Sequence, residues 1–327
     1  MSINVKLSQA RSGGASEGRG YFKELVEIDR DGVFFTCKYF AMASAGVVYH
    51  VPMLCGFSVE EFKDMLISIG GDKYQRMDPT KGKNPFAYMR WAFGVKHKFY
   101  KEAEELAKKN FTWEKMRASG RIGKFTKPFI TIAKFSDVLK VLKKDLLEDV
   151  LNGRIENPLE IISDGAPGSL ANLITTYYFS DDGVYKWYPP LERVVKVTDE
   201  VTPLWKCYMM AFANLRPFGK IYRLDFGGKN EERPFDGGVV TNFANLFLDK
   251  YQLISCIKVP TKEALEVNKG VASLSAYNYL LQPAEKVGKA YPSDGRNLHG
   301  FYDVSDEVIQ KEYDFAVKNW QTGKYFS

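Results

Sequence analysis

The sequence between Tyr39 and Val59 contains no Asp, Glu, Lys or Arg. A run of this length could cross a bilayer, and an alternative is that it lies in the interior of a globular protein. Ser44, Gly46 and Pro52 interrupt the run, and many of its other residues favour strands. We therefore expect two buried strands joined near Ser44 rather than a membrane span.

The clearest helix signal follows directly. Ser58 and Glu61 have the spacing of a capping box, and Phe57 and Phe62 occupy the positions of a hydrophobic staple. This helix should end at Gly70, where two glycines follow each other. Periodicity and end signals predict further helices at residues 85–93, 98–118, 136–152, 168–179, 203–215, 239–254, 262–281 and 305–320.

A small β element is expected near the N-terminus. Residues 25–28 and 33–35 are apolar enough for two strands, and Asp31-Gly32 between them is a typical hairpin turn. A further short strand is expected within residues 219–226. The predicted fold class is therefore mainly α with a small N-terminal β element (α+β).

Glycine and proline mark the expected domain boundaries. Residues 1–20 include a small, polar, glycine-rich stretch that is typical of a flexible arm. A second cluster of glycine and proline lies between residues 153 and 168. We expect two helical lobes, residues 21–153 and 168–327, with a basic cleft or strip.

Positive charge is concentrated in residues 73–128. This window contains fifteen Lys and Arg against five Asp and Glu, a surplus of ten, whereas the whole chain carries a net charge of +6. Ten aromatic residues lie in the same window. Cations that follow a phosphate backbone, interleaved with rings that stack on bases, suit single-stranded nucleic-acid binding without sequence preference.

The basic window supplies the candidate binding residues. Two glycine-containing basic loops, residues 81–83 and 117–127, are the main candidates, although an ordinary solvated surface would look the same. Two aromatic candidates have helical spacing and could pack in the core instead. The predicted nucleic-acid-binding residues are Lys81, Lys83, Tyr88, Arg90, Trp91, Lys96, Lys98, Arg117, Arg121, Lys124 and Lys127.

No catalytic signature is evident in the sequence. The three histidines are His50, His97 and His299, and none has a metal-ligand partner at close spacing. We expect no nucleophile elbow, and no P-loop occurs. We therefore expect no enzyme activity, no cofactor and no metal. A carboxylate-held metal site would leave little trace, and an alternative nuclease site would use Asp225, Glu231, Asp236 and Lys229.

The cysteines and the N-terminus point to an intracellular protein. Cys37, Cys55, Cys207 and Cys256 are far apart, as is typical of buried thiols in a reducing compartment. The first six residues lack the apolar core of a signal peptide. The predicted location is cytoplasmic or within a virion.

Together these features favour an assembly protein that coats single-stranded RNA or DNA, such as a viral nucleoprotein or capsid protein. Its partners would be nucleic acid, with RNA favoured, and other copies of the chain bound through the arm of residues 1–20. Two alternatives remain: a structural shell protein without nucleic acid, and a carboxylate-metal enzyme that acts on nucleic acid.

Overall fold

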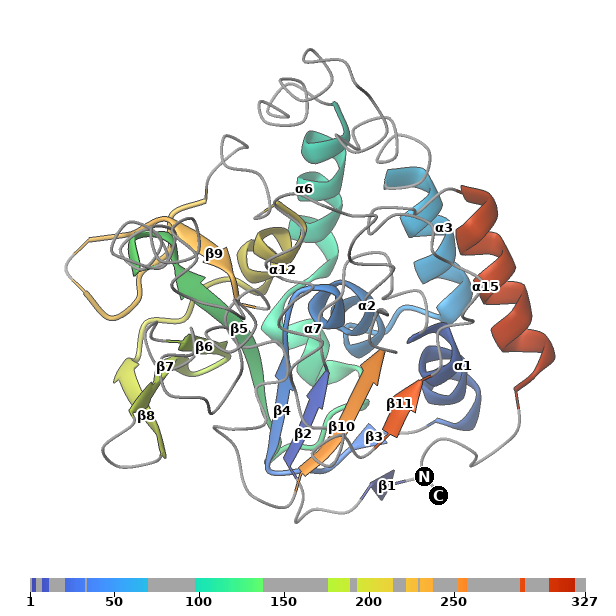
Figure 1. Cartoon of the computed structure of the whole chain (residues 1–327), viewed down its shortest axis with the longest axis horizontal. Helices are drawn as coiled ribbons and strands as arrows, with labels where there is room; N and C mark the ends of the chain where they lie inside the picture. Colours follow the sequence, from blue (N-terminus) through green and yellow to red (C-terminus); the bar gives the residue numbers. More distant parts are fainter. Residues whose placement is uncertain are drawn as a thin grey trace, which may run out of the picture.

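A nine-stranded mixed β-sheet organises the chain in the computed structural model (Figure 1). The structure describes residues 2–3, 8–11, 21–32, 34–69, 98–137, 176–188, 193–213, 222–228, 230–237, 252–257, 289–291 and 306–320.

The strand order is β11-β10-β2-β4-β5-β6-β7-β8, and β9 also pairs with β5. The strands from β11 to β5 in this order are parallel to one another, whereas β6 and β9 pair with β5, and β7 and β8 pair onward from β6, in antiparallel fashion. A separate parallel pair joins β1 (Ser2–Ile3) to β3 (Phe34–Phe35). The bounds of the sheet strands are β2 Ser8–Arg11, β4 Tyr39–Met42, β5 Lys127–Lys134, β6 Thr176–Ser180, β7 Gly183–Tyr188, β8 Arg193–Thr198, β9 Pro234–Asp236, β10 Gln252–Ile257 and β11 Lys289–Tyr291.

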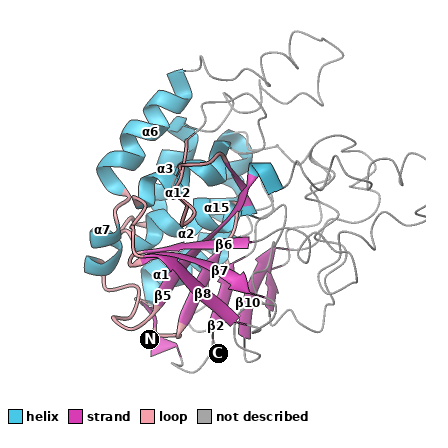
Figure 2. Cartoon of the chain, turned by 90° about the vertical axis from the view of Figure 1, so that its left-hand side faces the viewer, coloured by secondary structure: helices cyan, strands magenta, loops and turns pink. Residues whose placement is uncertain are grey.

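The described helices lie together on one side of the sheet (Figure 2). They are α1 Phe22–Asp31, α2 Ala45–Leu54, α3 Val59–Ile69, α6 Lys98–Asn110, α7 Trp113–Ala118, α12 Leu204–Ala213 and α15 Asp306–Lys318. Side chains alternate along β5, as a strand requires. Ile130 and Ile132 join the main core, whereas Phe129 packs with Ala41 and Tyr178 in a second, smaller cluster.

The uncharged run is half strand and half helix. Residues 39–42 form β4, as expected, but the second predicted strand is wrong, because residues 45–54 form α2. Every residue of α2 is buried, which explains why this segment is apolar on all sides and lacks helical periodicity. Within the described residues, no helix is long and apolar enough to cross a membrane.

The predicted N-terminal hairpin is also wrong. Residues 25–28 belong to α1, which buries Phe22, Leu25 and Val26. Gly32 has a φ of 61°, so it is the left-handed C-cap of α1 and not part of a hairpin turn. A glycine after an apolar segment fits both structures, and only the tertiary packing distinguishes them.

Other helix predictions have mixed outcomes. The capping box is confirmed: the Glu61 backbone N donates to Ser58 Oγ at 3.1 Å, and the Ser58 backbone N donates to Glu61 Oε2 at 2.8 Å. Residues 203–215 and 305–320 contain α12 and α15. The segment 98–118 divides into α6 and α7. Two predicted helices end in residues that form strands. The last residues of the segment 168–179 belong to β6, and the last residues of the segment 239–254 belong to β10. The helices predicted at 85–93 and 262–281, and residues 138–152, lie outside the described residues.

The predicted fold class, mainly α with two helical lobes, is wrong. The sheet crosses the expected boundary at residues 153–168, because β5 pairs with both β6 and β9. Residues 8–11, within the predicted arm, form β2 between β4 and β10. Strands that are covered on both faces read as short apolar runs without alternation, which resemble helix segments.

Candidate active site

Ser44 lies at a sharp turn between a strand and a helix. Strand β4 ends at Met42, and α2 begins at Ala45. Ser44 has a φ of 46° and a ψ of −119°, and among the described residues it is the one non-glycine with a positive φ. An L residue adopts this conformation only where the surrounding structure imposes it, and such residues are frequent at active sites.

Backbone groups alone make the hydrogen bonds that start α2, and the Ser44 side chain does not cap this helix. The Gly46 backbone N donates to the Ala43 carbonyl at 2.8 Å, and the Val47 N donates to the Ser44 carbonyl at 2.9 Å. The Ser44 hydroxyl makes no capping bond to α2. A serine on a strained strand-to-helix turn, presented by small neighbours, is a nucleophile elbow.

The prediction that the chain has no nucleophile elbow is therefore wrong. Around Ser44 the pattern Gly-x-Ser-x-Gly fails at one position, where Met42 stands in place of the first glycine. The signal that could have found the site is the set of small residues around the serine, Ala43, Ala45 and Gly46, inside a long uncharged run.

The strand register places Asp236 just beyond the end of β4, where the chain turns into the elbow. Met42, the last residue of β4, is opposite Ile130 of β5, two residues before Ile132. Ile132 pairs with Tyr177 of β6 on one edge of β5. Its pairing with Asp236 must therefore use the other edge, the one that β4 occupies up to Ile130. Asp236 thus follows the end of β4 along the same edge.

The residue after Asp236 holds it close to β5. Asp236 is buried, with 4% of its surface exposed. A Cβ at Gly237 would lie 2.3 Å from the Thr131 carbonyl oxygen and 2.7 Å from the Ile132 nitrogen. Only glycine allows this approach, so the Asp236-Gly237 segment is fixed against the strand beside the elbow.

The first turn of α2 adds a donor to the site. The N–H of Ala45, at the first position of the helix, has no acceptor within the helix. In a nucleophile elbow the backbone N–H of the residue after the nucleophile stabilises the oxyanion of the tetrahedral intermediate. The described site thus contains a nucleophile, a buried carboxylate and an oxyanion donor.

His50 does not reach this constellation. It is fully buried in α2, and its ring nitrogens face the Gly46 carbonyl and the carboxylate of Glu24. His50 is thus a core residue. His97 and His299 lie outside the described residues.

Part of the predicted nucleic-acid site cannot be located. Lys98 is the first residue of α6. Six other predicted nucleic-acid-binding residues lie outside the described residues: Lys81, Lys83, Tyr88, Arg90, Trp91 and Lys96.

Three of the remaining cations have acidic partners within the fold. Arg117 Nε donates to Asp181 Oδ2 at 2.6 Å, and Arg121 NH2 donates to Asp29 Oδ1 at 2.8 Å. Lys127 Nζ donates to Asp182 Oδ2 at 2.6 Å. Lys124 is exposed, beside the ring of the exposed Phe125.

The Lys127–Asp182 pair shifts the titration of both groups. Burial by itself would lower the pKa of Lys127, but hydrogen bonds to Asp182 and Tyr185 outweigh it and raise the pKa. Burial would raise the pKa of Asp182, yet the hydrogen bonds that it accepts from Lys127 and Tyr185 lower the pKa below its usual value. Both groups are therefore held in their charged forms.

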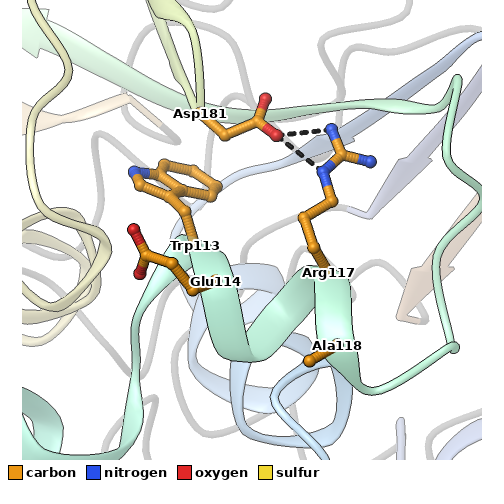
Figure 3. A pocket seen from close by; sticks show the side chains of 5 residues that line it. All are labelled: Trp113, Glu114, Arg117, Ala118 and Asp181. Atoms are coloured by element: carbon orange, nitrogen blue, oxygen red, sulfur yellow. Dashed lines mark hydrogen bonds and ion pairs between the residues drawn. The ribbon is translucent and has the colours of Figure 1, made fainter.

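A pocket of about 560 Å³ on the surface of α7 does not provide a second site (Figure 3). Arg117 extends across it to Asp181, and its NH1 donates to the carbonyls of Gly123 and Thr126. The Trp113 indole N–H donates to the Thr202 carbonyl at 2.8 Å. The cation and the indole donor are thus already used within the protein.

The alternative metal site is not assembled in the described part of the chain. No group of three or more His, Cys, Asp or Glu that could hold a metal occurs there. Asp225 Oδ1 accepts the backbone N–H groups of Gly227 and Gly228, as in an ordinary turn. Lys229 lies outside the described residues.

No protein-family model and no curated protein matches this sequence. Several solved structures are similar in fold at low identity. VipD from Legionella pneumophila has a TM-score of 0.39 at 11% identity, covering 80% of this chain and 54% of that chain. Human GIVD cytosolic phospholipase A2 has a TM-score of 0.38 at 10% identity, covering 77% of this chain and 42% of that one.

Another similar structure is full-length ExoU in complex with SpcU, from the type III secretion system of Pseudomonas aeruginosa. Its TM-score is 0.28 at 12% identity, covering 98% of this chain and 54% of that chain. This chain therefore spans about half the length of these three structures.

The prediction of a non-enzymatic, nucleic-acid-coating viral protein is wrong. The mixed sheet carries a serine on a nucleophile elbow with a buried carboxylate at the same edge. Charge surplus in one segment misled the prediction, because Arg117, Arg121 and Lys127 have partners distant in sequence.

Proposed function

We propose that this chain is a serine acyl hydrolase that cleaves lipid esters, of the patatin-like phospholipase type. One observation carries the proposal: the strained turn at Ser44 follows the end of β4, and the buried Asp236 pairs with β5 just beyond that end, on the same edge. A nucleophile with a carboxylate beside it is the minimum set for covalent acyl transfer.

In the proposed mechanism Ser44 Oγ attacks the carbonyl carbon of the ester, and Asp236 accepts the hydroxyl proton. The Ala45 N–H donates to the oxyanion that forms. Collapse of the tetrahedral intermediate releases the alcohol, which takes the proton from Asp236, and leaves the acyl group on Ser44. Water activated by Asp236 then releases the fatty acid and restores the serine.

The base in this scheme is Asp236, since the histidine of the described region is used elsewhere. His50 is fully buried, and both of its ring nitrogens have partners on α1 and α2. A two-residue Ser-Asp arrangement is therefore the form that the described residues support.

A fluorophosphonate probe and a phospholipid substrate test the proposal. Phospholipid is the first ester to try, since one of the similar structures is named as a phospholipase A2. The wild-type chain should be phosphonylated at Ser44 and should release fatty acid from phosphatidylcholine vesicles. Ser44→Ala should lose both reactions, and Asp236→Asn should lower both rates by at least about a hundredfold.

The control is Ser119→Ala, just after α7, which should keep both reactions. Labelling of another residue in the wild type, or hydrolysis by a folded Ser44→Ala variant, would rule out the proposed site. The proposed location is cytoplasmic, which the free thiols of Cys37, Cys55 and Cys207 support.

A further inference from the structure

Glu24 and His50 form an ionisable pair in the core that the proposed mechanism does not use. Both side chains have no exposed surface. His50 Nε2 lies 3.1 Å from Glu24 Oε2, and His50 Nδ1 lies 2.9 Å from the Gly46 carbonyl oxygen. The pair connects α1 with the first turn of α2.

The chemistry of the partners fixes where the protons are. A carbonyl oxygen only accepts, so Nδ1 of His50 must carry a hydrogen. A single proton then lies between Nε2 and Glu24, which makes the pair either imidazolium with carboxylate or neutral imidazole with carboxylic acid. The pair has no net charge in either form, so burying it costs less than burying a single unpaired charge.

Aromatic rings hold the imidazole in place. The Tyr21 ring, just before α1, meets it edge-on with centroids 4.6 Å apart. The Phe40 ring of β4 lies 6.3 Å from it. The imidazole is thus enclosed between the strand that leads into the elbow and the two helices behind it.

The pair acts on the elbow through Gly46. The N–H of this residue donates to Ala43, and its carbonyl oxygen lies next to His50. Both ends of Gly46 are therefore held, and the preceding peptide contains the Ala45 N–H that faces the oxyanion in the proposed mechanism.

We propose that Glu24 and His50 are positioning residues of the nucleophile elbow, an inference that rests on the proposed function. His50 fixes the Gly46 carbonyl, and Glu24 fixes the imidazole of His50. Together they hold Ser44 and the Ala45 N–H in the geometry of attack, where a displacement of about 1 Å costs about a hundredfold in rate.

Three variants separate this positioning role from a purely structural one. Glu24→Gln keeps a hydrogen bond, because its amide can donate to Nε2 of neutral His50. In that background His50→Asn places its amide N–H where Nδ1 stood and retains the bond to Gly46. His50→Phe in the same background keeps an aromatic ring but loses that bond. Thermal unfolding establishes that each variant is folded.

The measurements are the rate of Ser44 phosphonylation and the kcat and KM for a short-chain ester. Glu24→Gln should stay within about threefold of the wild type. The double variant Glu24→Gln with His50→Phe should react at least about tenfold more slowly than Glu24→Gln with His50→Asn. The loss should appear in kcat, with KM within about twofold.

Equal rates in the two folded double variants would overturn the positioning role. If neither double variant folds, Glu24→Ala, which removes the hydrogen bond to Nε2 of His50, is compared with Glu24→Gln. A folded Glu24→Ala that reacts at least about tenfold more slowly than Glu24→Gln supports the inference, and a smaller difference overturns it. A wild-type chain that is not phosphonylated at Ser44 overturns the proposed function and the positioning role together. If the wild type is phosphonylated at Ser44 but the two double variants react at equal rates, the positioning role alone is overturned.

Discussion

At the scale of single residues, the site depends on two backbone positions that few side chains tolerate. Ser44 is held at a positive φ, which costs a non-glycine residue about 1–3 kcal/mol. The fully buried α2 that follows stabilises this turn, because moving Ser44 to a relaxed conformation would displace the helix from the core. Gly237 is the second position, since it lies against the backbone of β5.

Gly237→Ala should therefore destabilise the protein by about 1–3 kcal/mol and lower ester hydrolysis, because the new Cβ would push Asp236 away from β5. Urea unfolding and the fatty-acid release assay measure the two effects. The matched control is Gly228→Ala, where a Cβ would meet nothing within 4 Å. Equal stability of the two variants would contradict the close packing of Gly237.

Asp182 should contribute to the pH dependence of stability. The pKa of Asp182 is lowered in the folded state. The carboxylate therefore stabilises the fold at pH values above its unfolded-state pKa, and this stabilisation is lost as the pH falls through its folded-state pKa. Lys127, whose pKa is raised, contributes below its unfolded pKa and loses this contribution as pH rises through the folded value. The effect is small, because both side chains are partly exposed.

Urea unfolding of Asp182→Asn and wild type across a pH series measures this contribution. The difference between their midpoints should be largest near neutral pH and should shrink as pH falls through the range where Asp carboxyls titrate. A difference that stays constant down to the acid limit would contradict the pairing of Asp182 with Lys127.

At the scale of elements, the helix ends are fixed by specific contacts. Helix α3 begins with the reciprocal hydrogen bonds of Ser58 and Glu61. At the C-terminal end of the preceding helix, Arg121 NH1 donates to the carbonyls of Met53 and Phe57, and its NH2 pairs with Asp29. A residue that the sequence favours as a phosphate ligand thus satisfies carbonyls at the end of α2.

Ser58→Ala should lower the free energy of unfolding by about 1 kcal/mol, because it removes the side-chain acceptor for the Glu61 N–H. Urea unfolding measures the change. Ser68→Ala, near the end of the same helix, is the comparison and should change stability by less than about 0.5 kcal/mol. A larger effect at Ser68 than at Ser58 would show that the capping box does not define the start of α3.

At the scale of the whole molecule, distant segments complete one sheet and one core. Strand β5 has β4 and β9 along one edge and β6 along the other. The core also needs α12, which packs against α2 and α6. The elements before residue 153 therefore leave β5 and the buried face of α2 incomplete.

A fragment of residues 1–153 should consequently fail to fold on its own, although these residues include the stretch from which a separate lobe was expected. It lacks β6, β9 and α12, so apolar residues such as Ile130 and Ile132 would be exposed to water. Circular dichroism should show no cooperative thermal transition in the fragment, whereas the full chain should unfold cooperatively. A cooperative transition in the fragment would contradict this dependence.

The sequence alone determined the features that depend on neighbours along the chain. The capping box at Ser58 predicts the start of α3, and the uncharged run from Tyr39 predicts a buried segment, because both signals lie within a few turns of the backbone. Only the tertiary structure decided that Asp236 pairs with β5 just beyond the end of β4, where Ser44 follows, since strand pairing across distant segments leaves no local pattern. It also decided the role of Arg117, because the acid that binds it, Asp181, lies far along the sequence.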